Sequence, residues 1–153
     1  GHQPMTNKDN TIYIMFNGEI YNAFKLKNDL IKSNYNFKSK TDTEIILALY
    51  EKYGLEFTLQ KLNGMFAICI LDLKKNIIFL ARDRYGIKPL YIAENNECIM
   101  FASEQKAILA NPKFKRELNK EGLYEYFTFQ NFLSNSTLII DNRLSAKSYF
   151  WVS

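Results

Sequence analysis

The sequence predicts an α+β fold in which helices flank stacked antiparallel strands. Apolar residues recur at helical spacing in the first part of the chain, over 23–33 and again over 45–54. From residue 65 to residue 103 the pattern changes to short apolar runs separated by polar turns, which is typical of β-hairpins. These runs are continuous rather than alternating, so both faces of the strands should be covered. Helices packed on stacked antiparallel sheets provide that cover.

The first half of the chain should contain one strand and three helices. The run TIYIMF predicts a strand over 11–16, and Asn22 can cap a helix over 23–33. Thr41 and Glu44 have the spacing of a capping box ahead of a helix that Gly54 should end. The stretch LEFTLQKLN predicts a short further helix that ends near residue 64.

The second half should begin with two hairpins. The first pairs 65–73 with 76–83, and the second pairs 89–94 with 97–103 around Asn95-Asn96. Short helices are expected over 103–110 and over 118–127, the latter capped by Asn119. The tail over 136–153 is typical of loop and strand.

Length, composition and charge exclude several classes of protein. A chain of 153 residues forms one domain and can bury roughly 70% of its unfolded surface. The net charge of +4 comes from interleaved charges, and the densest basic stretch, NPKFKREL, is short, so no nucleic-acid partner is expected. Apolar runs stay below the roughly 18 residues of a membrane span, and no signal peptide opens the sequence. A cytoplasmic location without membrane association is therefore expected.

The number and positions of the cysteines and the histidine argue against a zinc site. Cys69 and Cys98 lie in apolar runs, which predicts buried, reduced thiols and a reducing compartment. His2 is the single histidine, so four nitrogen and sulfur ligands for zinc cannot be assembled.

Two polar clusters remain as candidates for chemistry. Asn17-Gly18-Glu19 follows the first strand, and Asp42 lies at the start of a helix. A side-chain amide and a glycine N–H can donate to one developing oxyanion, while carboxylates can hold a substrate ammonium group. Such parts suit an amide-cleaving pocket for an amino acid. Equally, Asn-Gly can be a tight hairpin turn and Asp42 a first-turn charge or cap, and the residues alone leave both interpretations open.

Six blocks follow one another along the chain: GHQPM, FNGEIYN, TDTEIILALYEKYG, LNGMFAICILD, ARDRYGIKPLYI and FASEQKAIL. In this order they resemble class II glutamine amidotransferase domains, specifically the glutaminase half of glutamine-hydrolysing asparagine synthetases. The resemblance runs from Gly1 to about Asn111 and continues more weakly beyond. It implies an N-terminal-nucleophile fold, a four-layer αββα sandwich of antiparallel sheets, incomplete at the N-terminus. Residues 1–115 would be a partial amidotransferase domain, and 116–153 its end and the lead-in to an absent synthetase domain.

The resemblance also assigns roles to residues. Asn17 and Gly18 would form the oxyanion hole, and Glu19 and Asp42 would hold the α-amino group of glutamine. The stretch 81–91 would be a structural turn with a charge network over Arg82–Asp83–Arg84, a phosphate contact being the alternative. The family's nucleophile is a cysteine at the mature N-terminus. This sequence begins too late to contain it, so the chain alone is expected to be inactive.

The function implied by the resemblance is the release of ammonia from glutamine for ATP-dependent amidation of aspartate. This domain would need no cofactor, whereas ATP and Mg are expected for the absent synthetase domain. The expected partners are glutamine and the synthetase domain of a longer chain, with a homodimer left open. Two alternatives remain: a glutamine-binding or interaction domain without a nucleophile, and the glutaminase domain of another amidotransferase.

Overall fold

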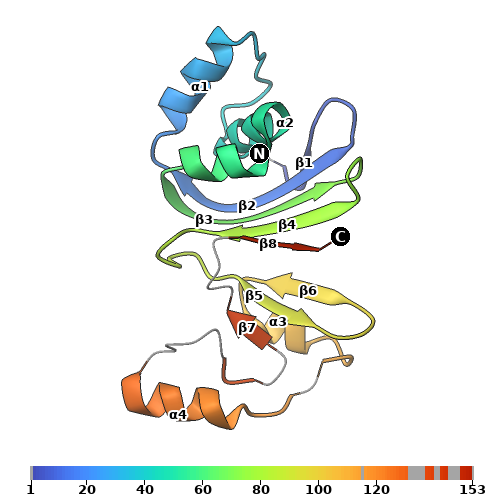
Figure 1. The fold of residues 1–153 in the computed structure, drawn as a ribbon, viewed down its shortest axis with the longest axis vertical. Helices are drawn as coiled ribbons and strands as arrows, with labels where there is room; N and C mark the ends of the chain where they lie inside the picture. Colours follow the sequence, from blue (N-terminus) through green and yellow to red (C-terminus); the bar gives the residue numbers. More distant parts are fainter. Residues whose placement is uncertain (1, 115, 131–136, 140–141, 145–148, 153) are drawn as a thin grey trace. The chain divides into compact units, whose positions relative to one another are not determined.

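The computed structural model describes residues 2–114, 116–130, 137–139, 142–144 and 149–152. The chain divides into two compact units, Gly1–Ile87 with Tyr149–Ser153, and Lys88–Ser148 (Figure 1). Each unit combines helices with an antiparallel sheet, so the predicted α+β class is confirmed.

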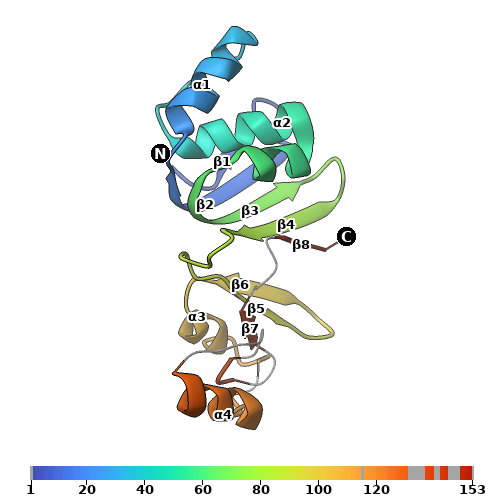
Figure 2. The same cartoon turned by 60° about the vertical axis from the view of Figure 1, so that its left-hand side comes forward.

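The first unit is a five-stranded sheet covered on one face by two helices. All neighbouring strands are antiparallel, in the order β1-β2-β3-β4-β8. Helices α1 and α2 lie together on one side of this sheet in both views (Figures 1 and 2). The main apolar core fills the space between the helices and the sheet. The elements are β1 (Met5–Thr6), β2 (Ile12–Ile20), α1 (Ala23–Lys32), α2 (Asp42–Lys61), β3 (Gly64–Asp72), β4 (Ile77–Arg82) and β8 (Tyr149–Val152).

Strand β2 shows which side chains face the helices. Ile12, Ile14 and Ile20 are buried in the core. The intervening Met15, Asn17 and Glu19 are exposed. Because successive side chains of a strand point to opposite faces, Asn17 and Glu19 lie on the face away from α1 and α2.

The prediction that β2 ends at residue 16, with Asn17-Gly18 as a possible turn, is wrong. The strand continues to Ile20, and Asn17 and Gly18 pair with Ala67 and Phe66 of β3. The turn does not form because the partner strand provides a regular ladder through this segment. Tertiary pairing therefore overrides the local turn preference of Asn-Gly.

Two expected helix caps are used differently. The Asn22 side chain does not cap α1; it donates to the carbonyl of Lys61 at 2.8 Å and accepts from the N–H of Asn63 at 3.0 Å. Thr41 makes no side-chain cap either, and the Glu44 carboxylate accepts from the N–H groups of the preceding loop instead of closing a capping box. In both places the polar side chain forms its hydrogen bonds with a neighbouring segment and not with the end of the helix.

The predicted break at Gly54 is confirmed. Gly54 has φ 80° and ψ 178° inside α2, a conformation that separates two helical stretches. Such a conformation is essentially restricted to glycine. The Thr58 hydroxyl then donates to the Gly54 carbonyl at 2.7 Å, which supports the start of the second stretch.

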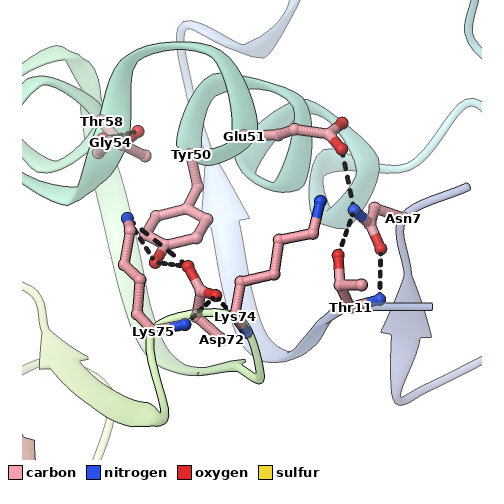
Figure 3. Close-up of polar contacts among 9 residues, drawn as sticks. All are labelled: Asn7, Thr11, Tyr50, Glu51, Gly54, Thr58, Asp72, Lys74 and Lys75. Carbon is pink, nitrogen blue, oxygen red and sulfur yellow. Dashed lines mark hydrogen bonds and ion pairs between the residues drawn. The ribbon is translucent and has the colours of Figure 1, made fainter. Parts of the chain in front are cut away.

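A buried polar cluster ties α2 to the β3–β4 hairpin (Figure 3). The Tyr50 hydroxyl donates to Asp72 Oδ2 at 2.7 Å, and the N–H groups of Lys74 and Lys75 donate to Oδ1 at 3.1 Å. Burial alone would raise the pKa of Asp72, but the hydrogen bonds and the nearby Lys75 ammonium, 3.4 Å away, hold this pKa below its usual value. Burial and Asp72 together raise the pKa of Tyr50.

The second unit contains a three-stranded sheet in the order β6-β5-β7. The predicted hairpin around Asn95 is confirmed, and the Asn95 side chain accepts from the N–H groups of Glu97 and Cys98, both at 2.9 Å. Asn119 caps the last helix as predicted, because its side chain accepts from the N–H of Glu121. The elements are β5 (Tyr91–Glu94), β6 (Ile99–Ala102), α3 (Gln105–Leu109), α4 (Lys120–Phe129) and β7 (Asn142–Leu144).

Candidate functional site

The candidate site lies at one edge of β2, where β1 stops. In antiparallel strands the backbone groups of alternate residues point to opposite neighbours. The carbonyl of Ile12 accepts from Asn7 on the β1 side, and both backbone groups of Phe16 are bonded on that side too. Gly18 and Ile20 therefore also direct their backbone groups toward the β1 edge. β1 begins only at Met5, opposite Ile14, and no strand of the described residues continues the edge beyond Phe16.

Gly18 presents the open position on this edge. Phe16 on one side is bonded to the Gln3 side chain, and the N–H of Ile20 on the other side donates to Asp42 Oδ2 at 2.9 Å. Among the residues that the structure describes, none accepts from the Gly18 N–H. This N–H is therefore a hydrogen-bond donor available to a ligand.

The predicted site residues lie close to this open N–H. Asn17 and Glu19 are exposed on the face away from the helices, one residue before and one residue after Gly18. Asp42 is brought to the same edge by its bond to Ile20. Within the described parts of the chain, neither the Asn17 amide nor the Glu19 carboxylate has a hydrogen-bond or ion-pair partner. One corner of the sheet thus gathers two donors and two carboxylates.

Glycine is required at this corner by close packing of the two strands. A Cβ on Gly18 would lie 2.8 Å from the Cα of Phe66 and closer still to the carbonyl oxygen of Met65. The contact is reciprocal, because a Cβ on Gly64 would lie 2.9 Å from the Cα of Ile20. Real Cβ atoms do not approach so closely, so a side chain at either position would push β2 and β3 apart.

The turn after β4 supports β3 opposite Gly18. Asp83 accepts from the N–H groups of Phe66 at 3.2 Å, Tyr85 at 3.1 Å and Ile87 at 2.9 Å. Arg82 Nη2 donates to the carbonyl of Gly86 at 2.5 Å, and Gly86 needs its φ of 62° to make this turn. The predicted structural role of this turn is therefore observed, with backbone groups among the partners of both charged side chains.

Cys69 does not have the character of a nucleophile. Cys69 lies in the middle of β3 and is 7% exposed, and burial raises the pKa of its thiol to about 11. At neutral pH this thiol is almost entirely protonated, whereas the thiolate is the reactive form. Cys98 precedes β6 and is only partly buried, so the expectation that it sits buried within a strand is wrong. The N–H of Cys98 donates to the Asn95 side chain in the turn, so Cys98 lies outside the strand. Both cysteines are free thiols.

Sequence reasoning missed two residues of this corner, Gln3 and Gly64. Gln3 lies in GHQPM, which contributed to the resemblance but carried no chemical signal of its own. Gly64 follows Asn63 in a second Asn-Gly pair, which was interpreted as a helix end. The repetition of Asn-Gly in FNGEI and LNGMF is the one sequence signal that could have indicated that the two glycines lie at the same corner of the sheet.

The described residues contain neither a membrane-spanning helix nor a cluster of metal-binding side chains. No helix there is both long and apolar enough to cross a membrane. No group of three or more histidine, cysteine, aspartate or glutamate side chains is arranged to hold a metal ion in the part of the chain that is described.

Comparison with known proteins places this chain among amidotransferases. The glutamine amidotransferase domain family matches residues 1–151. Asparagine synthetase (glutamine-hydrolyzing) 1 of Bacillus subtilis is 41% identical over 138 residues, which is 90% of this chain and 22% of that protein. Putative asparagine synthetase (glutamine-hydrolyzing) 2 of Methanocaldococcus jannaschii is 36% identical over 99% of this chain and 35% of its own length.

A solved structure with the same fold is the glutamine phosphoribosylpyrophosphate amidotransferase of Bacillus subtilis complexed with ADP and GMP. It is 27% identical, has a TM-score of 0.60, and covers 69% of this chain and 25% of its own. The family match and the fold thus identify a class II glutamine amidotransferase domain with the N-terminal-nucleophile fold, as predicted. Within that class, the chain belongs to the asparagine synthetase family. It spans about a fifth to a third of the length of these curated relatives.

Proposed function

We propose that this domain binds glutamine at the Gly18 corner of β2 and stabilises the oxyanion formed when its carboxamide is attacked. The observation that carries the proposal is that neither the Gly18 N–H nor the neighbouring Asn17 amide has a hydrogen-bond partner among the described residues. Two preorganised donors aimed at one oxygen are the parts of an oxyanion hole. Each such donor lowers the barrier by about 3–4 kcal/mol.

Glu19 and Asp42 would hold the other end of glutamine. Asp42 uses Oδ2 for the N–H of Ile20, which leaves Oδ1 for a ligand. Side chains two residues apart on a strand lie about 6.7 Å apart on the same face, so Asn17 and Glu19 can contact opposite ends of one amino acid. A carboxylate hydrogen-bonded to an ammonium group makes one of the stronger polar contacts available to a protein.

The complete reaction would convert glutamine and water into glutamate and ammonia. In the family mechanism a cysteine thiolate attacks the carboxamide, ammonia leaves, and water cleaves the resulting thioester. Cys69 cannot supply that thiolate, because burial raises its pKa to about 11. We therefore propose that this chain alone binds glutamine without hydrolysing it.

The ammonia would serve the ATP-dependent amidation of aspartate, carried out by a synthetase domain of a longer chain. The support is the family membership and the greater length of the relatives named asparagine synthetase. ATP and Mg would belong to that other domain, as the similarity to asparagine synthetases implies. The 36–41% identity of those two relatives favours aspartate as acceptor over the substrate of the phosphoribosylpyrophosphate enzyme.

Calorimetric titration of glutamine into the 153-residue chain tests the binding site. Asn17→Ala removes one oxyanion donor, and Asp42→Asn removes the charge while keeping an oxygen for the N–H of Ile20. Each change should weaken glutamine binding about tenfold, because one charged or preorganised hydrogen bond is lost. Asn96→Ala, at an exposed turn position, is the matched control and should bind as the unmodified chain does.

Two results would contradict the proposal. Equal affinity of the Asn17→Ala variant and the unmodified chain would exclude Asn17 from the site. Ammonia released from glutamine by the chain alone, measured by a coupled assay, would show that a nucleophile is present after all. Binding without ammonia release would support the role as a glutamine-binding domain that needs a nucleophile from elsewhere.

A further inference from the structure

The side chain of Gln3 occupies a position that a strand backbone would normally fill. Met5 lies opposite Ile14 and Thr6 opposite Tyr13, so extending this antiparallel register by two residues places Gln3 opposite Phe16. The carboxamide of Gln3 makes both bonds of that rung. Its Nε2 donates to the carbonyl of Phe16 at 2.9 Å, and the N–H of Phe16 donates to its Oε1 at 2.6 Å.

A carboxamide can complete one rung of the ladder and no more. It offers one donor and one acceptor in the plane of the sheet, whereas a backbone strand would continue to the next rung. The edge of β2 is therefore closed at Phe16, while no described residue occupies the next rung at Gly18.

Gln3 and Asp42 hydrogen-bond to the backbone of β2 on either side of Gly18. Gln3 holds both backbone groups of Phe16, and Asp42 holds the N–H of Ile20. The segment between Phe16 and Ile20 carries the Gly18 N–H and the Asn17 side chain. With both ends fixed, the direction of this N–H and the face on which Asn17 lies are determined before any ligand arrives.

We propose that Gln3 is a positioning residue for the oxyanion hole. Its carboxamide terminates the edge of β2 at Phe16, keeps the Gly18 N–H directed outward, and holds Asn17 beside it. This inference rests on the proposed binding of glutamine at the same corner. Gln3 itself touches no reacting atom in this scheme.

The test compares Gln3→Met with Gln60→Met in the 153-residue chain. Both changes remove an exposed carboxamide, but the Gln60 side chain bonds only weakly to Glu56, at 3.4 Å on the helix surface. NMR titration with L-glutamine gives the affinity, and amide hydrogen exchange reports on individual residues of β2. In the unmodified chain, saturating glutamine should slow exchange at Gly18.

The Gln3→Met variant should bind glutamine about tenfold more weakly, and glutamine should no longer slow exchange at Gly18. Exchange at Phe16 should become faster without glutamine, while Ile14 and Ile20 keep their protection. The Gln60→Met variant should match the unmodified chain. Gln3→Glu keeps an acceptor for the Phe16 N–H and loses the donor, so a smaller loss of affinity is expected, and this variant serves if Gln3→Met fails to fold.

The possible failures are distinguishable. If the unmodified chain does not bind glutamine, the proposed function fails and this inference fails with it. If it binds and the Gln3→Met variant binds equally well, with the same slowing at Gly18, only the positioning role is overturned. Faster amide exchange along the whole of β2 in the Gln3→Met variant would show that Gln3 acts in folding alone. This result would likewise overturn the positioning role.

Discussion

At the scale of single residues, the candidate site depends on what is left unpaired at one strand edge. Gln3 and Asp42 bond to Phe16 and Ile20 on either side of Gly18, whose own N–H has no partner among the described residues. The same glycine, with Gly64, allows β2 and β3 to approach more closely than any side chain would permit. One residue type therefore provides both the donor and the packing that holds the donor in place.

A change at Gly64 tests the close packing of β2 and β3 without altering the proposed ligand site. Gly64 contacts the β2 backbone but is not part of that site. Gly64→Ala should lower the free energy of unfolding by about 1–3 kcal/mol, since the added Cβ forces the strands apart. Urea denaturation at neutral pH measures the change, with Asn96→Ala as the control. A Gly64→Ala variant with unchanged stability would mean that the strands separate at no cost.

Residue identity was predictable at this site, but backbone geometry was not. The resemblance named Asn17, Gly18, Glu19 and Asp42, and the structure brings all four to one corner of the sheet. The local sequence could not show that Asn17-Gly18 continues a strand, because pairing with β3 decides this and β3 begins at residue 64. The role of Gln3 was equally hidden, since a side chain that replaces a backbone rung leaves no pattern in the sequence.

At the scale of elements, polar side chains tie the helices to the sheet. Asn22 joins the start of α1 to the end of α2. Asp72 joins α2 to the β3–β4 hairpin through Tyr50 (Figure 3). Helix and strand periodicity predicted these elements well, whereas the caps at Asn22 and Thr41 were wrong because the side-chain partners lie in distant segments.

The Asp72 cluster makes stability depend on pH. The pKa of Asp72 is lowered in the folded chain, so between the folded and unfolded pKa values the unfolded chain binds more protons. The resulting stabilisation is present above the unfolded pKa, about 3.9, and is lost as pH falls through the lower folded value. Urea denaturation at pH 6 and pH 3 should show this decrease.

Asp72→Asn should remove part of this pH dependence. At pH 6 the variant should be less stable by about 1–3 kcal/mol, because a buried charged acceptor of several hydrogen bonds is replaced. Between pH 6 and pH 3 it should lose less stability than the unmodified chain. Tyr50→Phe keeps the carboxylate but removes the hydrogen bond that lowers the pKa of Asp72 most, so its decrease should lie between those of the unmodified chain and Asp72→Asn. Parallel pH profiles for Asp72→Asn and the unmodified chain would contradict the assignment.

At the scale of the whole molecule, the two units differ in how the chain builds them. The second unit is one continuous segment, Lys88–Ser148, whereas the first takes its last strand, β8, from the end of the described chain. The sequence predicted strand structure in the tail, but it could not show that this strand joins β4. Such a long-range pairing is determined by which sheet edge is open.

Removal of residues 149–153 should expose one side of β4. Ile78 and Leu80 lie opposite Val152 and Phe150 and direct their N–H groups toward β8, whereas Phe79 and Ala81 direct theirs toward β3. Amide exchange should therefore become at least about tenfold faster at Ile78 and Leu80, with smaller changes at Phe79 and Ala81. Equal changes at all four amides would show that the truncation unfolds the strand.

The position of β8 also has a consequence for biosynthesis. Residues 1–87 leave the ribosome long before residues 149–152. The sheet of the first unit therefore lacks its outer strand, β8, until the whole intervening unit has been synthesised. During that interval the nascent chain presents the backbone of β4 as an unpaired edge, the kind of surface on which two unfinished chains can join. Slow translation between residues 88 and 148 would lengthen this exposure, whereas a chaperone held at the exit tunnel would shield it.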